Sequence, residues 1–222
     1  MVGFIDLEIN ADTNSKYKRT VFDIINISFI TEDLSIGFNS FIKPVNNNGK
    51  LFEEIINLTG ITQEQVDNGV QFDEALSTLF ERAFGVGKIY TWGDCDAFFM
   101  RKNSKLCSKN NRKMVYKLSN KFVDFSEKVK KSFDLKSSIS LINTAYILGI
   151  DYDKHHNAEY DCRLLRDIYL ALQSNKVNKS KLNEYKTMDL LREVNQKIVL
   201  DNNHFKLVDC KTDKVIVIET IV

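Results

Sequence analysis

The spacing of apolar residues predicts a β-strand at residues 4–9, close to the start of the chain. Apolar side chains occupy alternate positions there, and neither glycine nor proline interrupts the segment. Side chains alternate between the two faces of a strand, so Asp6 and Glu8 share one face and apolar residues share the other. Neighbouring carboxylates repel each other, and a globular protein keeps them together mainly around a cation. Taken alone, the pair also fits an ordinary half-exposed strand with a polar face.

The pattern over the following residues predicts an α/β domain. Strand-like runs at 19–30 and 35–45 are separated only by a short turn, which predicts a three-stranded antiparallel meander. Beyond Pro44 the apolar spacing becomes helical and alternates with short strands. The expected helices are 51–58, a short one opening at 62, 72–83, 94–105, 126–133, 138–148 and 157–173, and the expected strands are 88–92 and 121–125.

Local signals predict where some helices begin and end. Thr62 and Gln65 have the spacing of a capping box, and Gly60 is expected to end the preceding helix. That preceding helix is expected to bury an apolar stripe with i, i+4, i+7 spacing, whose last member is Leu58.

The C-terminal part of the chain differs in composition. Residues 174–181 are rich in asparagine, lysine and serine and predict a linker, so we expect one domain at 1–175 and an extension at 176–222. The extension is expected to hold one helix and a small β-meander. The helix is expected at 182–196, and the strands at 198–200, 204–208 and 214–220. Packing against the core, self-association, and binding of a protein partner or of nucleic acid all stay open for it.

Composition and charge limit the class of protein. The chain has 222 residues, a hydrophobic content of 43% and a formal net charge of +1, so any basic surface must be local. No apolar run approaches membrane-spanning length, and no signal-peptide pattern opens the chain. The cysteines form no CxxC pair, which is typical of reduced thiols; they are Cys95, Cys107, Cys162 and Cys210. We therefore expect a cytoplasmic protein without membrane association.

One stretch of the chain is strongly basic. Residues 97–123 contain eight lysines and arginines and no acid. Such a run is usually a solvated face. The alternative is a contact surface for phosphates, with Tyr116 and Phe122 available for stacking on bases.

Two further acids occupy positions where a core residue is expected. Asp161 precedes Leu165 by four residues and so begins the apolar stripe of the helix at 157–173. Asp96 likewise begins the face of its helix that carries Phe99 and Met100, just after a strand ends. Buried carboxylates must be paired or ligated. Together with the first pair they predict an all-oxygen site, which suits Mg²⁺ or Mn²⁺.

His156 is the candidate general base. It lies five residues before Asp161, in the loop entering the helix, with Asn157 as the expected N-cap. Imidazole titrates near neutral pH and can take a proton from water beside a metal centre. An isolated histidine in a loop is also often an exposed surface residue without a functional role. The neighbouring His155 could serve instead, although the spacing favours His156.

Four segments of the chain resemble, in order, the motifs of the DnaQ-like DEDDh 3′–5′ exonucleases. They are Asp6-Leu7-Glu8, the "LTGIT" of 58–62, the "WGDCDAFF" of 92–99 and the "HNAEYD" of 156–161. The similarity covers roughly residues 3–173 and is closest to ERI-like and KapD-like members. The tyrosine subfamily would need a tyrosine where Asn157 stands, so the histidine subfamily is indicated.

The resemblance implies a ribonuclease H-like fold, a five-stranded mixed sheet with helices on both faces. It also implies two Mg²⁺ or Mn²⁺ ions, with Asp6, Glu8 and Asp161 on one ion. Asp6 would bridge to the second ion, Asp96 would support that ion largely through water, and His156 would act as general base. Asp94 departs from the family pattern as an extra acid; it could be a rival ligand or a helix N-cap, and we favour the cap.

The resemblance further implies hydrolysis of terminal phosphodiesters from a free 3′ end of single-stranded nucleic acid, releasing 5′-mononucleotides. RNA is slightly favoured over DNA. The implied substrate-binding residues are Leu7, Ile9, Asn10, Ile61 and Phe99. Two alternatives stay open: a non-catalytic regulatory module that keeps the fold, and a proofreading subunit of a polymerase.

Overall fold

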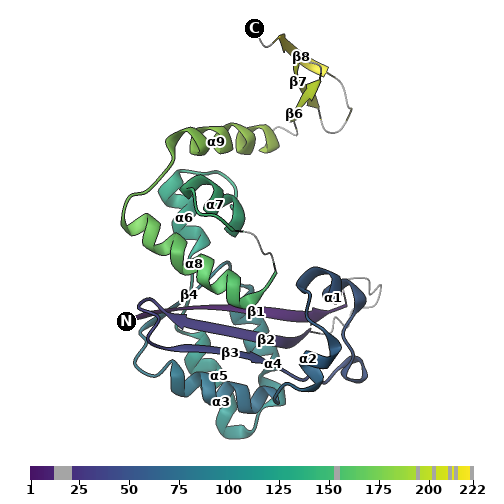
Figure 1. Ribbon diagram of the computed structural model, residues 1–222, viewed down its shortest axis with the longest axis vertical. Coiled ribbons are helices and arrows are strands. Elements are labelled where there is room, and N and C mark those ends of the chain that lie inside the picture. The colour runs from purple at the N-terminus through teal and green to yellow at the C-terminus, as the bar shows by residue number, and fades with distance from the viewer. Residues whose placement is uncertain are drawn as a thin grey trace.

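A five-stranded sheet with the strand order β3-β2-β1-β4-β5 forms the centre of the chain (Figure 1). The computed structural model describes residues 1–12, 22–152, 156–193, 196–201, 204–209, 212 and 215–220. β1 pairs antiparallel with β2 and β2 with β3, whereas β4 runs parallel to β1 and β5 parallel to β4. The predicted meander and mixed sheet are therefore confirmed. The strands are β1 (Val2–Ala11), β2 (Phe22–Thr31), β3 (Gly37–Phe41), β4 (Lys88–Thr91) and β5 (Phe122–Asp124).

Helices cover both faces of this sheet (Figure 1). They are α1 (Glu53–Thr59), α2 (Gln63–Asp67), α3 (Phe72–Arg82), α4 (Cys95–Asn103), α5 (Lys109–Ser119), α6 (Ser126–Phe133), α7 (Leu141–Leu148), α8 (Ala158–Gln173) and α9 (Lys179–Glu193). Thr62 and Gln65 form the predicted capping box of α2, and Gly60 ends α1 in a left-handed conformation. The predicted burial of Leu58 is wrong, since its side chain is 50% exposed.

The two faces of β1 belong to different hydrophobic clusters. Ile5 and Leu7 point into a cluster built with α3, α4 and α5. Phe4 points the other way, into a cluster built with α6, α7 and α8. Because side chains alternate along a strand, Asp6 and Glu8 lie on the face that α8 covers. The predicted segregation of acids and apolar residues on β1 therefore holds.

α5 is a helix that the sequence pattern does not predict. Val115 and Leu118 are buried, while most of the remaining surface carries lysine, arginine and asparagine. So narrow an apolar stripe is a weak periodic signal, and the strong charge masks it. Its N-terminus is nevertheless capped, because the Ser108 side chain accepts a hydrogen bond from Asn111 N.

The C-terminal part of the chain contains α9 and a second, three-stranded antiparallel sheet in the order β6-β7-β8. Its strands are β6 (Gln196–Asp201), β7 (His204–Asp209) and β8 (Val215–Thr220), as the predicted meander requires. α9 lies against α7, and its residues Tyr185 and Asp189 are buried. The predicted boundary between 175 and 176 stays a prediction. Of the helices in the described ranges, none combines the length and the hydropathy that crossing a membrane requires.

Candidate active site

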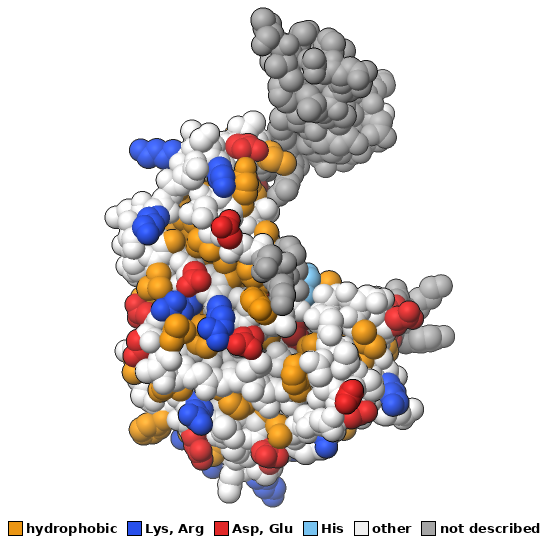
Figure 2. Space-filling model, viewed as in Figure 1, with side chains coloured by type: hydrophobic (Ala, Val, Ile, Leu, Met, Phe, Trp, Pro, Cys, Tyr) orange, Lys and Arg blue, Asp and Glu red, His pale blue; other side chains and the backbone are white. Residues whose placement is uncertain are grey.

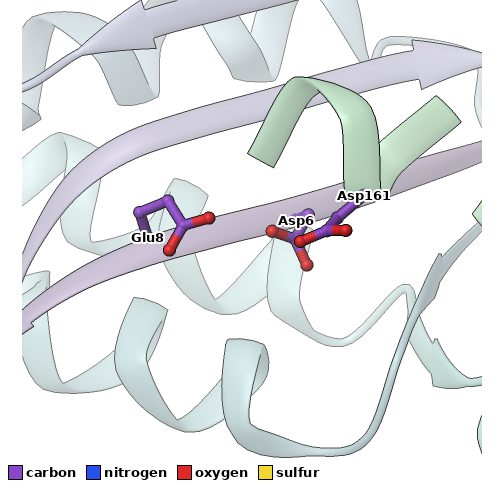
Figure 3. Close-up of side chains that lie close together, drawn as sticks. All are labelled: Asp6, Glu8 and Asp161. Carbon is purple, nitrogen blue, oxygen red and sulfur yellow. The ribbon is translucent and has the colours of Figure 1, made fainter. Parts of the chain in front are cut away.

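Three carboxylates from two elements converge on the α8 side of the sheet (Figure 3). Asp6 and Glu8 extend from β1, and Asp161 extends from the first turn of α8. Each offers one carboxylate oxygen, and these three oxygens lie within 4.8 Å of one another. Residues 153 positions apart along the chain thus form one oxygen-rich cluster, with the chemistry that Mg²⁺ and Mn²⁺ prefer.

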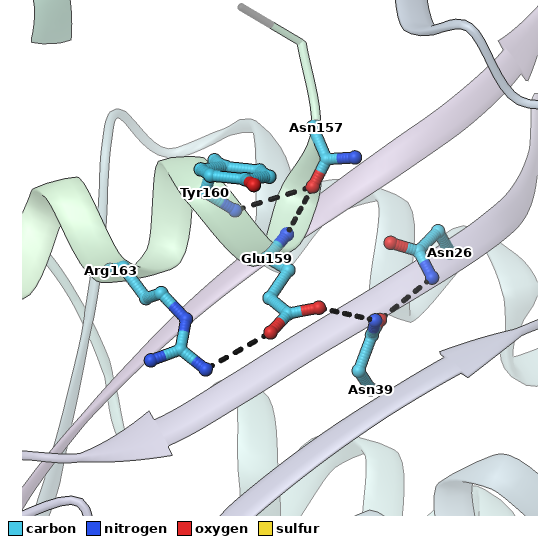
Figure 4. A network of polar contacts seen from close by, with 6 residues as sticks. All are labelled: Asn26, Asn39, Asn157, Glu159, Tyr160 and Arg163. Atoms are coloured by element: carbon cyan, nitrogen blue, oxygen red, sulfur yellow. Dashed lines mark hydrogen bonds and ion pairs between the residues drawn. The ribbon is translucent and has the colours of Figure 1, made fainter. Parts of the chain in front are cut away.

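The N-terminus of α8 is fixed by its own cap. The Asn157 side-chain oxygen accepts hydrogen bonds from Glu159 N at 3.2 Å and Tyr160 N at 3.3 Å, as predicted (Figure 4). The Asp161 amide donates to Asn157 O at 2.9 Å and closes the first turn. The cap therefore sets where the Asp161 carboxylate leaves the helix.

A chain of polar contacts ties the same turn to the sheet (Figure 4). The Asn39 amide nitrogen donates to Glu159 Oε2 at 3.1 Å, and the Asn26 amide nitrogen donates to Asn39 Oδ1 at 2.9 Å. Asn26 is the register partner of Glu8 across β1 and β2. Arg163 donates to the other Glu159 oxygen at 3.0 Å. Contacts across three elements thus hold Asp161 beside the acids of β1.

The electrostatics of the cluster favour bound protons or a bound cation. Burial, followed by the charges of Asp161 and Asp96, raises the pKa of Glu8 to about 8. Burial, followed by the charges of Asp96, Glu8 and Asp161, holds the pKa of Asp6 well above its usual range. In the part of the chain that the structure describes, no lysine or arginine forms an ion pair with Asp6, Glu8 or Asp96. A divalent cation would supply the missing positive charge.

Asp96 is buried near the cluster but is not one of its three members. It lies in the first turn of α4, just beyond the carboxyl end of β4, which runs parallel to β1. Its charge raises the pKa of Asp6 more than the charge of Glu8 or of Asp161 does. Burial raises the pKa of Asp96 itself to about 7, with a further contribution from Asp124. This placement agrees with support of a metal ion from a distance.

Asp124 is an acid near the site that the sequence interpretation missed. It ends β5, and its Oδ1 accepts hydrogen bonds from Gly93 N at 2.9 Å and from the Ser126 amide and hydroxyl. It therefore joins the turn after β4 to the turn after β5. An acid at the end of a parallel strand was the available signal.

Asp94 does not cap α4. It stands at the N-cap position, but its backbone is already helical, with φ −101° and ψ −4°, and its side chain accepts no capping hydrogen bond. A capping residue normally has an extended backbone that turns its side chain toward the first free amides. The favoured interpretation of Asp94 is therefore wrong, and the residue is exposed.

His156 is exposed and lies directly before the Asn157 cap. Its backbone has φ 52°, in the left-handed region that histidine, asparagine and aspartate adopt more often than other non-glycine residues. His155, the other candidate base, lies outside the described residues. The role of His156 as the general base stays a prediction.

Tyr152 is a second residue that the sequence interpretation missed. Its hydroxyl donates a hydrogen bond to Asp161 Oδ1. The segment at 151–155 was expected to be only a polar loop. No periodic or motif signal in the sequence links a loop tyrosine to a carboxylate nine residues later.

The five predicted substrate-binding residues occupy different environments. The side chains of Leu7 and Ile61 are only 7% and 4% exposed, inside separate hydrophobic clusters. Ile9 and Phe99 are half-buried at the rim of one cluster. Asn10 is fully buried; its amide donates to Lys50 O at 3.1 Å and accepts from Phe52 N at 3.0 Å. Its side chain therefore holds the turn before α1, and substrate binding by all five stays a prediction.

The basic stretch at 97–123 lies largely away from the carboxylates. α5 packs in the cluster on the opposite face of β1. Arg112 donates to Cys107 O at 3.1 Å, and Arg101 donates to Ser119 Oγ at 3.1 Å, so both guanidinium groups have local structural partners. Basic and acidic side chains are also intermixed on the face that Figure 2 shows. These placements favour a solvated face over a phosphate track that leads to the cluster.

A family model for exonucleases, RNase T, matches residues 4–169, which include Asp6, Glu8, Asp96 and Asp161. The chain belongs to this exonuclease family. The family confirms the predicted resemblance, and the acidic cluster lies where the exonuclease motifs were expected. No curated protein matches the chain.

Solved exonuclease structures share the fold. The nuclease domain of 3′hExo, described as a DEDDh family member bound to rAMP, has a TM-score of 0.63 and 20% identity over 80% of this chain and 93% of that chain. A 3′-exonuclease that recognises the 3′ end of the histone mRNA stem-loop has a TM-score of 0.64 and 20% identity, over 80% of this chain. Exonuclease I of E. coli with a dA16 oligonucleotide has a TM-score of 0.59 and 13% identity, over 94% of this chain. The chain spans 64% and 54% of the latter two proteins, and the likeness confirms the ribonuclease H-like α/β fold.

Proposed function

We propose that this protein is a divalent-metal-dependent 3′–5′ exonuclease that acts on single-stranded nucleic acid with a free 3′ end. It would hydrolyse the terminal phosphodiester and release 5′-mononucleotides. The observation that carries the proposal is the convergence of Asp6, Glu8 and Asp161 within 4.8 Å in a chain of the exonuclease family.

The carboxylates fit two Mg²⁺ or Mn²⁺ ions. Asp6, Glu8 and Asp161 would hold one ion, and Asp6 with Asp96 would hold the second. Asp6 suits the shared position, because its pKa responds to all three of the other carboxylates. When bound, the ions would lower the pKa of an attacking water and neutralise charge that develops on the phosphate and leaving oxygen.

Side chains and backbone of the protein would perform proton transfer and substrate binding. His156 would take the proton from the attacking water, and its exposure lets it pass that proton on to solvent. The backbone at Ile9 and Asn10, with Leu7, Ile61 and Phe99, would receive the terminal nucleotide. Binding of a protein partner, or self-association, through residues 176–222 is a further proposal.

RNA is the slightly favoured substrate. The two similar structures with the higher TM-scores are described with rAMP or with a histone mRNA stem-loop. Exonuclease I is described with DNA. The preference for RNA is therefore a proposal, and digestion of matched RNA and DNA substrates tests it.

The decisive experiment is digestion of matched single- and double-stranded RNA and DNA, with the 3′ end free or blocked. Reactions in Mn²⁺ and in Mg²⁺ should release mononucleotides from free single-stranded 3′ ends. EDTA, or the Asp6→Asn substitution, should reduce release to background, because both remove the proposed metal chemistry. Asp167→Asn makes the same change at an exposed acid of α8 outside the cluster and should keep activity. Efficient digestion by the Asp6→Asn protein would refute the proposal.

A thermal melt separates this enzyme from a non-catalytic module with the same fold. An ion that binds only the folded state raises the melting temperature by mass action. Mn²⁺ should therefore stabilise the wild-type protein and should have a much smaller effect on Asp6→Asn. A melting temperature that does not respond to Mn²⁺ or Mg²⁺ would favour the module.

A further inference from the structure

Tyr152, which follows α7, contacts Asp161, one of the three clustered carboxylates. Tyr152 is half-buried against the hydrophobic cluster of α6, α7 and α8, and its hydroxyl donates to Asp161 Oδ1. A phenol is an O–H donor at neutral pH, so the hydroxyl can donate to this carboxylate.

A hydrogen bond to one carboxylate oxygen restricts the orientation of both. A carboxylate has two oxygens, so Asp161 can accept from Tyr152 through Oδ1 and still offer an oxygen to the cluster. Donors of this kind orient metal ligands in many proteins, and their removal typically weakens metal binding. The Asp161 side chain is half-buried.

We propose that Tyr152 is a positioning residue for the metal centre, which orients the Asp161 carboxylate toward the cations. The proposal rests on the proposed exonuclease function. It assigns Tyr152 no contact with substrate and no part in proton transfer.

The test is Mn²⁺ titration of the full-length protein by calorimetry, with wild type, Tyr152→Phe and Tyr146→Phe. Tyr152→Phe removes only the hydroxyl and should weaken Mn²⁺ affinity by about 10- to 100-fold. Tyr146 is an exposed tyrosine on α7, so Tyr146→Phe makes the same chemical change and should bind Mn²⁺ as wild type does. In activity assays, Tyr152→Phe should need correspondingly more Mn²⁺ for half-maximal rate. At saturating Mn²⁺ its kcat should stay below the wild-type value with KM unchanged.

The outcomes distinguish this role from others. Wild-type Mn²⁺ affinity in Tyr152→Phe would show that the hydroxyl does not position the ligand, and tighter binding would show that it competes with the ion; either result overturns the proposal. Absence of Mn²⁺ binding by the wild-type protein would overturn the proposed function as well. A purely structural loss would lower the melting temperature of the metal-free protein without a selective change in Mn²⁺ affinity, and would also contradict the proposal.

Discussion

Glu8 and Asp96 link the stability of the metal-free protein to pH. Burial raises the pKa of Glu8 from 4.5 to about 8 and that of Asp96 from 3.8 to about 7. In the unfolded chain both groups lose their protons near their usual pKa values. Between about pH 4.5 and 8 the folded protein therefore binds more protons than the unfolded chain, and its free energy of unfolding falls as pH rises.

We therefore expect the melting temperature in EDTA to fall from pH 5 to pH 8. Glu8→Gln removes one of the titrating groups, so it should flatten this decline and raise stability at pH 8 by at least ~1 kcal/mol, or about 2–4 °C for a chain of this size. Saturating Mn²⁺ should also flatten the decline in the wild-type protein, because the ion binds the ionised carboxylates.

Calorimetric or fluorescence-monitored melts across this pH range measure the effect. Glu64→Gln removes an exposed glutamate of α2 and is the matched control, which should keep the wild-type slope. A Glu8→Gln protein with an unchanged pH slope would show that Glu8 is not held in a proton-binding environment.

Single-residue chemistry was predictable where it follows from spacing. The alternation of side chains along β1 placed Asp6 and Glu8 on one face of the strand, and helical spacing placed Asp161 on the inner face of α8. The structure brings these three acids together. Tyr152 was not predictable, because its contact with Asp161 follows no periodic spacing and no motif. Asp94 was misassigned because a residue type favoured at N-caps is not a cap when its backbone is already helical.

At the scale of elements, the segment after α2 is packed directly against the end of β3. Val70 N donates to Phe41 O at 3.0 Å, and Lys43 N donates to Val70 O at 2.9 Å, which forms a short parallel bridge. A Cβ atom added at Gly69 would lie 2.6 Å from Phe41 O and 2.7 Å from Phe41 C. Both are backbone atoms of the sheet, so they cannot swing away as a flexible side chain would.

Gly69→Ala is therefore expected to destabilise the protein by about 1–3 kcal/mol, because the bridge must shift to admit the methyl group. Gly87→Ala is the matched control, since no atom lies within 4 Å of its added Cβ. That control should stay within about 0.5 kcal/mol of wild type. Urea denaturation compares the three proteins, and equal stability of the two variants would contradict the close packing at Gly69.

Element boundaries followed from the sequence wherever capping chemistry fixed them. Gly60 and the Thr62 capping box ended or began helices as predicted. α5 escaped prediction because its buried stripe is narrow and its surface is highly charged. The packing of Gly69 on Phe41 joins residues 28 positions apart, so no local pattern could indicate it.

At the scale of the whole molecule, α9 is attached to the core by buried polar and apolar contacts. Asp189 is 2% exposed, and its Oδ2 accepts hydrogen bonds from Lys136 N at 3.1 Å and Ser137 N at 3.2 Å. Tyr185 packs in the cluster of α6, α7 and α8. The sequence predicted a helix and a meander here, but not this attachment, because its partners lie more than fifty residues apart along the chain.

Truncation tests which part of the C-terminal extension stabilises the exonuclease domain. A chain ending at residue 175 loses α9, exposes the apolar surface beneath Tyr185 and leaves the backbone amides of Lys136 and Ser137 without their acceptor. A chain ending at residue 193 keeps α9 and loses only the second sheet. We expect the shorter chain to unfold more easily by ~3 kcal/mol or more, which corresponds to roughly 6–12 °C in melting temperature.

Comparing the two truncated chains isolates the contribution of α9, because each chain lacks β6, β7 and β8. Any difference in their melting temperatures therefore reports α9 and the short connection before it. Asp189→Ala in the full chain should reproduce part of the loss, since it removes the acceptor for Lys136 N and Ser137 N while Tyr185 stays in place. Equal melting temperatures for the two truncated chains would support residues 1–175 as a self-sufficient domain and would assign α9 to the extension alone.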